Sequence, residues 1–96
     1  MIVVTRHKAL VEYLQEKGYV GSAVKVIPYI KSISEIRGEI VIGVLPLHLA
    51  VYCKEVWEVP LDLPLELREV ELGIKDIWRY ANPIQCYQVK NLRELT

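Results

Sequence analysis

The sequence has few of the residues that build disulfide frameworks and metal sites. Its two cysteines, Cys53 and Cys86, form no Cys-x-x-Cys pair and lie in apolar runs, so we expect two buried free thiols, with a disulfide as the alternative. The two histidines are scattered, the spacing of a zinc site is missing, and we expect no metal and no cofactor. No signal peptide is recognisable, which favours a reducing cytoplasm. No apolar run approaches the ~20 residues that span a bilayer, so no membrane partner is expected.

Net charge is also missing, because 12 Lys and Arg residues balance 12 Asp and Glu residues. A protein that coats long DNA or RNA is normally basic, so a long nucleic-acid partner is disfavoured. The charges are unevenly spread, however: residues 1–34 carry a net +3, residues 35–76 a net −5 and residues 77–96 a net +2. A small anionic ligand held by a few local cations therefore fits the composition, and the near-neutral surface favours self-association.

Several catalytic and nucleotide-binding motifs are absent. There is no Gly-x-Gly-x-x-Gly and no Gly-Lys-Ser/Thr, which argues against a dinucleotide fold and a P-loop ATPase. None of the three serines, Ser22, Ser32 and Ser34, lies in a nucleophile elbow, so a Ser-His-Asp triad is not supported. Asp62 is the single carboxylate at the end of a predicted strand, which disfavours a metal-dependent nuclease.

What the sequence does contain is an alternation of apolar, β-rich segments with helical patterns along one domain, residues 1–96. We expect strands at 2–4, 23–30, 39–43, 56–61 and 84–89. We expect helices between a Thr5 cap and a Gly18 stop, over 47–53 and over 73–81, with a single helical turn at 34–36. Residues 64–72 are ambiguous between a polar turn and a short helix, and residues 90–96 read as a polar tail.

This alternation predicts an α/β, Rossmann-like domain with a mostly parallel five-stranded sheet flanked by helices. The expected strand order is 2-1-3-4-5, which reverses the direction of the chain between strands 1 and 3. Ligands of such sheets bind at that switch point, beyond the carboxyl ends of the strands. Residues 5–8 and 43–48 fall there, and they hold both histidines of the chain.

Burial is predicted from the same patterns. The run 39–43 is apolar enough for burial on both faces of the sheet. Helix 47–53, with Pro46 in its first turn, is apolar nearly all round and is expected to pack deeply. Trp78 is expected to face inward with Ile74 and Ile77. The other tryptophan and the six tyrosines are interpreted mostly as core or interface residues.

The first switch-point segment combines a hydroxyl (Thr5), two cations (Arg6 and Lys8) and an imidazole (His7) at a predicted helix start. A helix N-terminus attracts phosphate through free N–H groups and the dipole, and Arg adds bidentate contacts. The segment therefore predicts a phosphate site, and a capped polar turn with solvated charges is the alternative.

In the second segment, Gly43 allows close approach of a backbone or a ligand, and Pro46 begins a helix facing the same crevice. His48 is either a functional group or a packed helix residue.

Three blocks in order resemble a family of small CRISPR-associated accessory proteins of the Csx type. They are Val-Val-Thr-Arg-His at 3–7, Gly-Val-Leu-Pro-Leu-His-Leu-Ala at 43–50, and Leu-Asp-Leu-Pro at 61–64 with the Glu-Leu pairs at 66–67 and 71–72. The sequence departs from the family where Lys8 replaces Pro, where Val44 replaces Thr, and where Arg68 is not followed by Gly. The resemblance covers most of the chain and implies a CARF-like sensor fold.

The resemblance also implies a ring nuclease of type III CRISPR defence: a homodimer that cleaves cyclic tetra-adenylate without metal by attack of a ribose 2′-OH. A non-cleaving sensor or sponge of cyclic oligoadenylate is the alternative, and a small dimeric interaction protein is a third. On the ring-nuclease reading, Arg6 stabilises transition-state charge, His7 is the base or a phosphate contact, and His48 is the second acid/base candidate. The expected ligand-binding residues are Thr5, Lys8, Gly43, Val44, Leu45, Pro46 and, as a further cation, Arg68.

Overall fold

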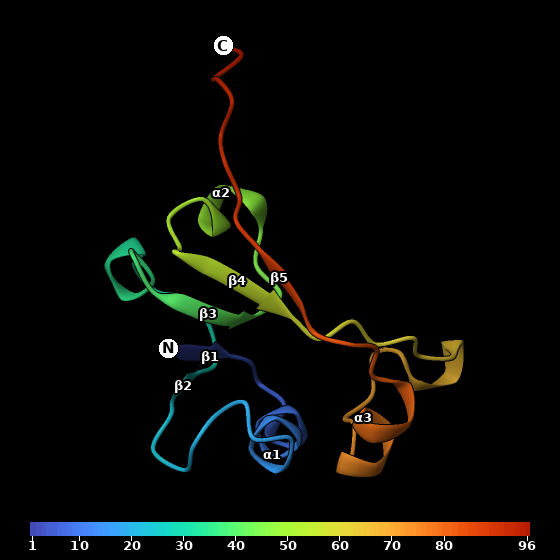
Figure 1. Cartoon of the computed structure of the whole chain (residues 1–96). Helices are drawn as coiled ribbons and strands as arrows, with labels where there is room; N and C mark the ends of the chain where they lie inside the picture. The colour runs from blue at the N-terminus through green and yellow to red at the C-terminus, as the bar shows by residue number, and fades with distance from the viewer.

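The computed structural model describes all 96 residues (Figure 1). The strands are β1 (Ile2–Val4), β2 (Lys25–Ile27), β3 (Ile40–Gly43), β4 (Glu55–Glu58) and β5 (Gln85–Tyr87). The α-helices are α1 (Lys8–Glu16), α2 (Leu47–Ala50) and α3 (Ile74–Tyr80), and two 3₁₀ turns are η1 (Ile33–Glu35) and η2 (Leu65–Leu67). No helix has the length and apolar character that crossing a bilayer would require.

The five strands form one sheet in the order β2-β1-β3-β4-β5, which confirms the predicted α/β, Rossmann-like fold and its strand order. β1 pairs in parallel with both β2 and β3, β3 pairs in parallel with β4, and only β5 is antiparallel. After β1 the chain therefore runs toward one edge of the sheet, and after β3 it runs toward the other edge. The predicted switch point lies between the ends of these two central strands.

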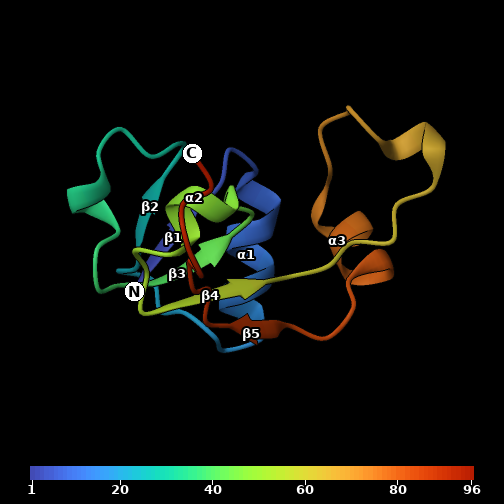
Figure 2. The same cartoon turned by 90° about the horizontal axis from the view of Figure 1, so that it is seen from above.

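Helices cover both faces of the sheet, with α1 and α3 on one side and α2 on the other (Figures 1 and 2). The face under α1 and α3 holds the larger core, which includes Val3 and Ile42 from the sheet together with Leu14 and Ile77 from the helices. The buried hydrophobic side chains outside that cluster are Ile2, Ile36, Val41, Ala50 and Val56. Val41 and Ile42 are both fully buried and point to opposite faces, which confirms the two-sided burial predicted for this strand.

Several predicted boundaries are wrong, and local chemistry explains each. α1 begins at Lys8 with His7 as its N-cap, because the Thr5 hydroxyl accepts a hydrogen bond from the His7 backbone N (3.1 Å) instead of capping the helix. Pro46 is the N-cap of α2 and not part of its first turn. β2 and β4 are shorter than predicted: β2 ends before Pro28 and β4 ends two residues before Pro60, since proline cannot donate to a ladder.

Other predicted boundaries differ less from those of the structure. The ambiguous stretch 64–72 contains the single turn η2, the predicted turn at 34–36 lies one residue earlier as η1, and β5 is shorter than 84–89.

Some predictions of burial are also wrong. α2 has only four residues, and only Ala50 is buried, while Leu47 is 74% exposed and His48 is exposed too. A helix of one turn packs only one side against the sheet. Because the apolar residues of α2 surround the helix, those on its other sides are exposed to solvent. Trp78 is 46% exposed at the edge between α1 and α3, where its indole N–H donates to the Glu16 carboxylate (2.7 Å).

The tyrosines and cysteines are similarly less buried than predicted. Tyr13 is the only buried tyrosine, and its ring meets Trp78 edge-on. Both cysteines are free thiols, as expected, but Cys53 is half-buried and Cys86 is exposed. Cys86 lies on β5, an edge strand whose three residues are all exposed.

Candidate functional site

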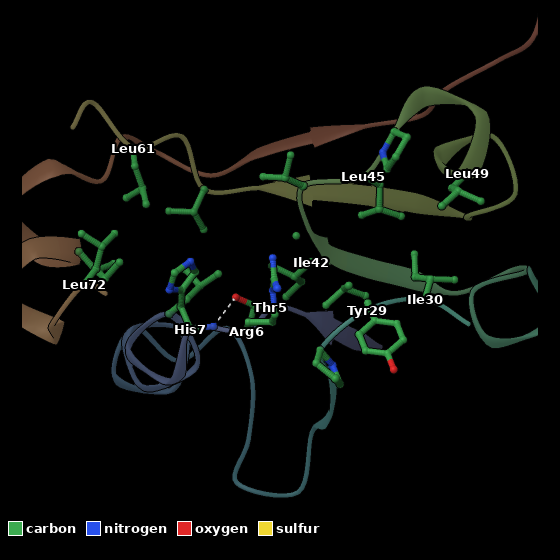
Figure 3. Close-up of a pocket in the computed structure, with 18 of the residues that line it drawn as sticks. Thr5, Arg6, His7, Tyr29, Ile30, Ile42, Leu45, Leu49, Leu61 and Leu72 are labelled. Atoms are coloured by element: carbon green, nitrogen blue, oxygen red, sulfur yellow. Dashed lines mark hydrogen bonds between the residues drawn. The ribbon is translucent and has the colours of Figure 1, made fainter. Parts of the chain in front are cut away.

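A cavity of about 590 Å³ opens at the carboxyl ends of the four parallel strands (Figure 3). Every one of these strands contributes the segment that follows it. Thr5–His7 follow β1, Pro28–Ile30 follow β2, Val44–Pro46 follow β3, and Val59, Leu61 and Leu63 follow β4. The cavity therefore lies where the strand order reverses, which is the position predicted for a ligand in this fold.

The lining combines a large apolar surface with a small positive region. Thirteen of its 19 residues are hydrophobic. The only cationic or titratable nitrogen groups are those of Arg6 and His7, and no Asp, Glu or Lys lines the cavity. A lining of this kind favours a ligand that carries negative charge at one point and apolar or planar groups elsewhere.

Arg6 and His7 are held by a short turn between β1 and α1. The Thr5 backbone N donates to the Ile27 carbonyl (3.0 Å), which ties the turn to β2, and the Thr5 hydroxyl accepts from the His7 backbone N (3.1 Å). Both side chains are exposed and project into the cavity (Figure 3). The one ion pair of the protein joins the Met1 amino group to Glu39, so no carboxylate neutralises Arg6. Its guanidinium is therefore available to an anion.

The N-terminus of α1 adds to this positive region. Its N-cap, His7, makes no side-chain hydrogen bond to the first turn, and no acidic residue lies in that turn. The free N–H groups of a first helical turn and the helix dipole both favour an anion. Arg6 and His7 lie immediately before this first helical turn, so their side chains and the helix N-terminus both attract an anion to the same place.

The structure brings together most of the residues predicted for the site. Thr5, Arg6, His7 and the segment Gly43–Pro46 all line the cavity. Three predicted residues do not line it. Lys8 is exposed at the start of α1, and His48 is exposed on α2. Arg68 lies after η2, where its Nε donates to the Leu63 carbonyl (3.4 Å).

The sequence reasoning missed the contribution of the segment after β2. Pro28, Tyr29 and Ile30 line the cavity, whereas they were predicted to lie within the strand. Pro28 was the available signal, because proline at this point ends a strand and moves the next residue to its carboxyl end. Val59 and Leu61 were missed for a similar reason, since both were assigned to a strand over 56–61 that ends at Glu58.

The groups with shifted pKa values all lie outside the cavity. A hydrogen bond from the Lys31 backbone N lowers the pKa of Glu35. Hydrogen bonds from the Trp57 indole (2.8 Å) and then from the Cys86 thiol lower the pKa of Glu55.

The pKa values of the two cysteine thiols are raised instead. The hydrogen bond to Glu55 (3.2 Å) raises the pKa of Cys86, and partial burial raises the pKa of Cys53. Both thiols therefore stay protonated at neutral pH, which makes them poor nucleophiles. No cluster of three or more His, Cys, Asp or Glu side chains has the arrangement of a metal site.

Gly43 has a structural role at the floor of this site. It is the last residue of β3 and pairs with Val4 of β1. A Cβ atom at this position would lie 2.5 Å from the Val4 carbonyl oxygen, and the residue has φ +156°. The close approach predicted at Gly43 is therefore that of a neighbouring backbone, which holds the ends of β1 and β3 together beneath the cavity.

Gly43→Ala is expected to destabilise the protein by roughly 2–4 kcal/mol, because two central strands must separate to admit the methyl group. Urea unfolding followed by circular dichroism measures the change as a shift of the midpoint. Gly21→Ala is the matched control: a Cβ there meets nothing within 4 Å, so its effect should stay within about 0.5 kcal/mol. Equal stability of Gly43→Ala and wild type would show that the strands do not pack as described.

Comparison with known proteins gives one match. The model of the family described as "Putative CRISPR-associated protein (Cas_VVA1548)" matches residues 2–90. No curated protein and no solved structure matches the chain. The family match spans all five strands and every segment that lines the cavity. The chain therefore belongs to this family of CRISPR-associated proteins.

Proposed function

We propose that the protein is a ring nuclease that binds cyclic tetra-adenylate as a homodimer and cleaves it without a metal ion, which ends type III CRISPR signalling. The observation that carries the proposal is the cavity at the switch point, whose only charged or titratable nitrogen groups are Arg6 and His7. CRISPR-associated family membership supports the biological setting. We expect the protein to act in the reducing cytoplasm, where its two thiols stay free, and not on long nucleic acids or membranes.

A cyclic oligoadenylate matches the two chemistries of the cavity. Its phosphates are anionic and would lie near Arg6 and the N-terminus of α1. Its bases are planar and largely apolar on their faces, which suits a lining in which 13 of 19 residues are hydrophobic. The absence of carboxylates from the lining means that a phosphate meets no repelling charge there.

The size of the cavity supports a dimer. Cavities of roughly 300–1,000 Å³ enclose single drug-sized molecules, so a cavity of about 590 Å³ holds part of a four-nucleotide ring and not the whole of it. A cyclic tetranucleotide has twofold symmetry, and a twofold dimer presents the same cavity twice. Val44 and Leu47 are large apolar side chains exposed beside the cavity and available for burial by a second copy.

Cleavage requires a ribose 2′-oxygen to attack the adjacent phosphorus in line with the bond that breaks. The attacking hydroxyl gives its proton to the His7 imidazole, the bond from phosphorus to the 5′-oxygen breaks, and the 5′-oxygen takes up a proton from water. Arg6 stabilises the charge that develops on the phosphate oxygens. The products are linear fragments ending in a 2′,3′-cyclic phosphate.

The remaining predicted residues have peripheral roles in this proposal. Lys8 and Arg68, which lie outside the cavity of one chain, would add positive charge around a larger ligand. The segment Gly43–Pro46 forms the wall next to the ring. His48 would act as a second acid or base only if it reaches the ring at the contact between two copies.

The experiment that tests the proposal is incubation of cyclic tetra-adenylate with the protein in EDTA and identification of the products. Linear fragments with cyclic phosphate ends support the nuclease. An intact ring recovered bound to the protein supports the alternative, a sensor or sponge, which the replacements at Lys8 and Val44 leave open. An intact ring that does not bind to the protein supports the third hypothesis, a small dimeric interaction protein.

A further inference from the structure

The segment after β2 places one exposed aromatic ring in the wall of the cavity. Tyr29 follows Pro28, and both line the cavity together with Ile30. The segment is anchored beside the Arg6 turn, because the Thr5 backbone N donates to the carbonyl of Ile27, the last residue of β2 (3.0 Å). Tyr29 and Arg6 are therefore held by two neighbouring strands whose relative position is fixed.

The Tyr29 side chain does not serve the core. It is 58% exposed, whereas Tyr13 of α1, whose ring meets Trp78 of α3 edge-on, is buried. Tyr29 is the only tyrosine or tryptophan that lines the cavity. The Lys31 ammonium lies 5.8 Å from the centre of its ring, which adds a positive charge at this edge of the site. An exposed aromatic ring in a concave wall is a surface for a planar ligand group.

The polar side chains of the cavity lie between two apolar parts, because Leu61 and Leu72 lie on the far side of His7 (Figure 3). Tyr29 and Ile30 lie on one side, with Leu45 and Leu49 across from them, and Arg6 lies between this apolar slot and His7. Bases stack on aromatic rings, and phosphates bind guanidinium groups. The apolar slot and Arg6 thus lie next to each other, as a base and a phosphate do along a nucleotide chain.

We infer that Tyr29 is the base-stacking residue of the site: one adenine of the ring packs against the Tyr29 ring in the slot below Leu45, and its phosphate lies at Arg6. The inference rests on the proposed function and adds detail to it, because it assigns base recognition to the segment after β2 and phosphate recognition to the segment after β1. Tyr29 is then a residue that positions the scissile phosphate and fixes the affinity for the base.

The test compares variants of Tyr29 for binding of cyclic tetra-adenylate in EDTA by isothermal titration calorimetry. Tyr29→Leu keeps an apolar side chain but removes the ring, and should weaken binding roughly 10-fold to 100-fold. Tyr29→Phe keeps the ring and should bind within about twofold of wild type. Tyr52→Leu is the matched control, because Tyr52 is exposed but lies outside the cavity, where Arg37 stacks on it at 5.1 Å.

A second readout follows the ring itself. With 3-fluorotyrosine incorporated, the fluorine signal missing from Tyr29→Phe identifies Tyr29. Stacking of adenine should shift this signal on addition of cyclic tetra-adenylate and, at higher concentration, of 5′-AMP. Circular dichroism of each variant checks that it is folded, which the exposure of Tyr29 leads us to expect.

The outcomes separate the inference from the proposed function. Unchanged affinity and cleavage in Tyr29→Leu would overturn the stacking role while the nuclease stands. Weaker binding and a shifted fluorine signal with an intact ring would uphold the stacking role while the nuclease fails. A Tyr29 signal that neither adenine ligand shifts would overturn the stacking role in every case.

Discussion

Arg6→Ala should lose roughly 10²–10³-fold in the rate of ring cleavage while binding of cyclic tetra-adenylate weakens far less. Arg6 is the only permanent cation that lines the cavity, and no carboxylate pairs with it. A group that stabilises charge developing on the phosphate acts mainly in the transition state, so its removal lowers kcat more than affinity. The remaining N-terminus of α1 and the apolar wall continue to hold the ground state.

Single-turnover cleavage and calorimetric binding, both in EDTA, measure the two effects separately. The binding curve of the wild type should saturate at one ring per two chains, as the proposed dimer requires. Arg79→Ala is the matched control, because Arg79 is exposed on α3 beside Tyr80 and does not line the cavity. Equal losses of rate and affinity in Arg6→Ala would assign Arg6 to ligand binding alone.

His7→Ala should reduce the cleavage rate by about 100-fold or more, because His7 is the only imidazole that lines the cavity and a positioned base contributes about that much. The variant should keep its fold. His7 is the N-cap of α1, but its side chain makes no capping hydrogen bond, so Ala removes no contact that holds the helix start.

Chemical rescue distinguishes a base from a phosphate contact. Added imidazole should restore part of the rate of His7→Ala if the missing group accepts the proton. No rescue, together with weakened ring binding, would identify His7 as a phosphate contact instead. His48→Ala tests the other assignment: a loss as large as that of His7→Ala would require His48 to reach the ring from the contact between two copies.

The strand order followed from the sequence because hydrophobic pattern and chain connectivity constrain it strongly. The run 40–43 is apolar at every position, and such a run has a stable place only at the centre of a sheet covered on both faces. Short crossovers and their right-handed sense then leave few arrangements for the other strands. The switch point, and with it the two segments that hold Arg6 and Gly43, could be predicted from this order alone.

The burial of individual side chains could not be predicted in the same way. The pattern of α2 is apolar on all sides, but whether such a helix is buried depends on how many turns it has and what lies over it. Trp78 satisfies the periodicity of α3, yet it lies at the edge of the α1–α3 contact because Glu16 offers its indole N–H a partner at 2.7 Å. Both facts depend on tertiary contacts that the periodicity does not contain.

Only part of the candidate site could be predicted from the sequence, for a related reason. Arg6 and His7 lie within the segment that follows β1 at the switch point, where chain order places them. The aromatic residue of the site lies after the edge strand β2, and its position depended on whether that strand ends before or after Pro28. An error of three residues at a strand end moved Tyr29 from the cavity wall into the sheet.

The most direct test of the nuclease is the fate of labelled cyclic tetra-adenylate incubated with purified protein in EDTA, resolved by chromatography and mass spectrometry. We predict linear di- or tetra-adenylate ending in a 2′,3′-cyclic phosphate, formed at a rate that Arg6→Ala and His7→Ala reduce. An intact ring in EDTA, whether bound or free, with cleavage appearing only on addition of a divalent metal or not at all, would contradict the proposed mechanism.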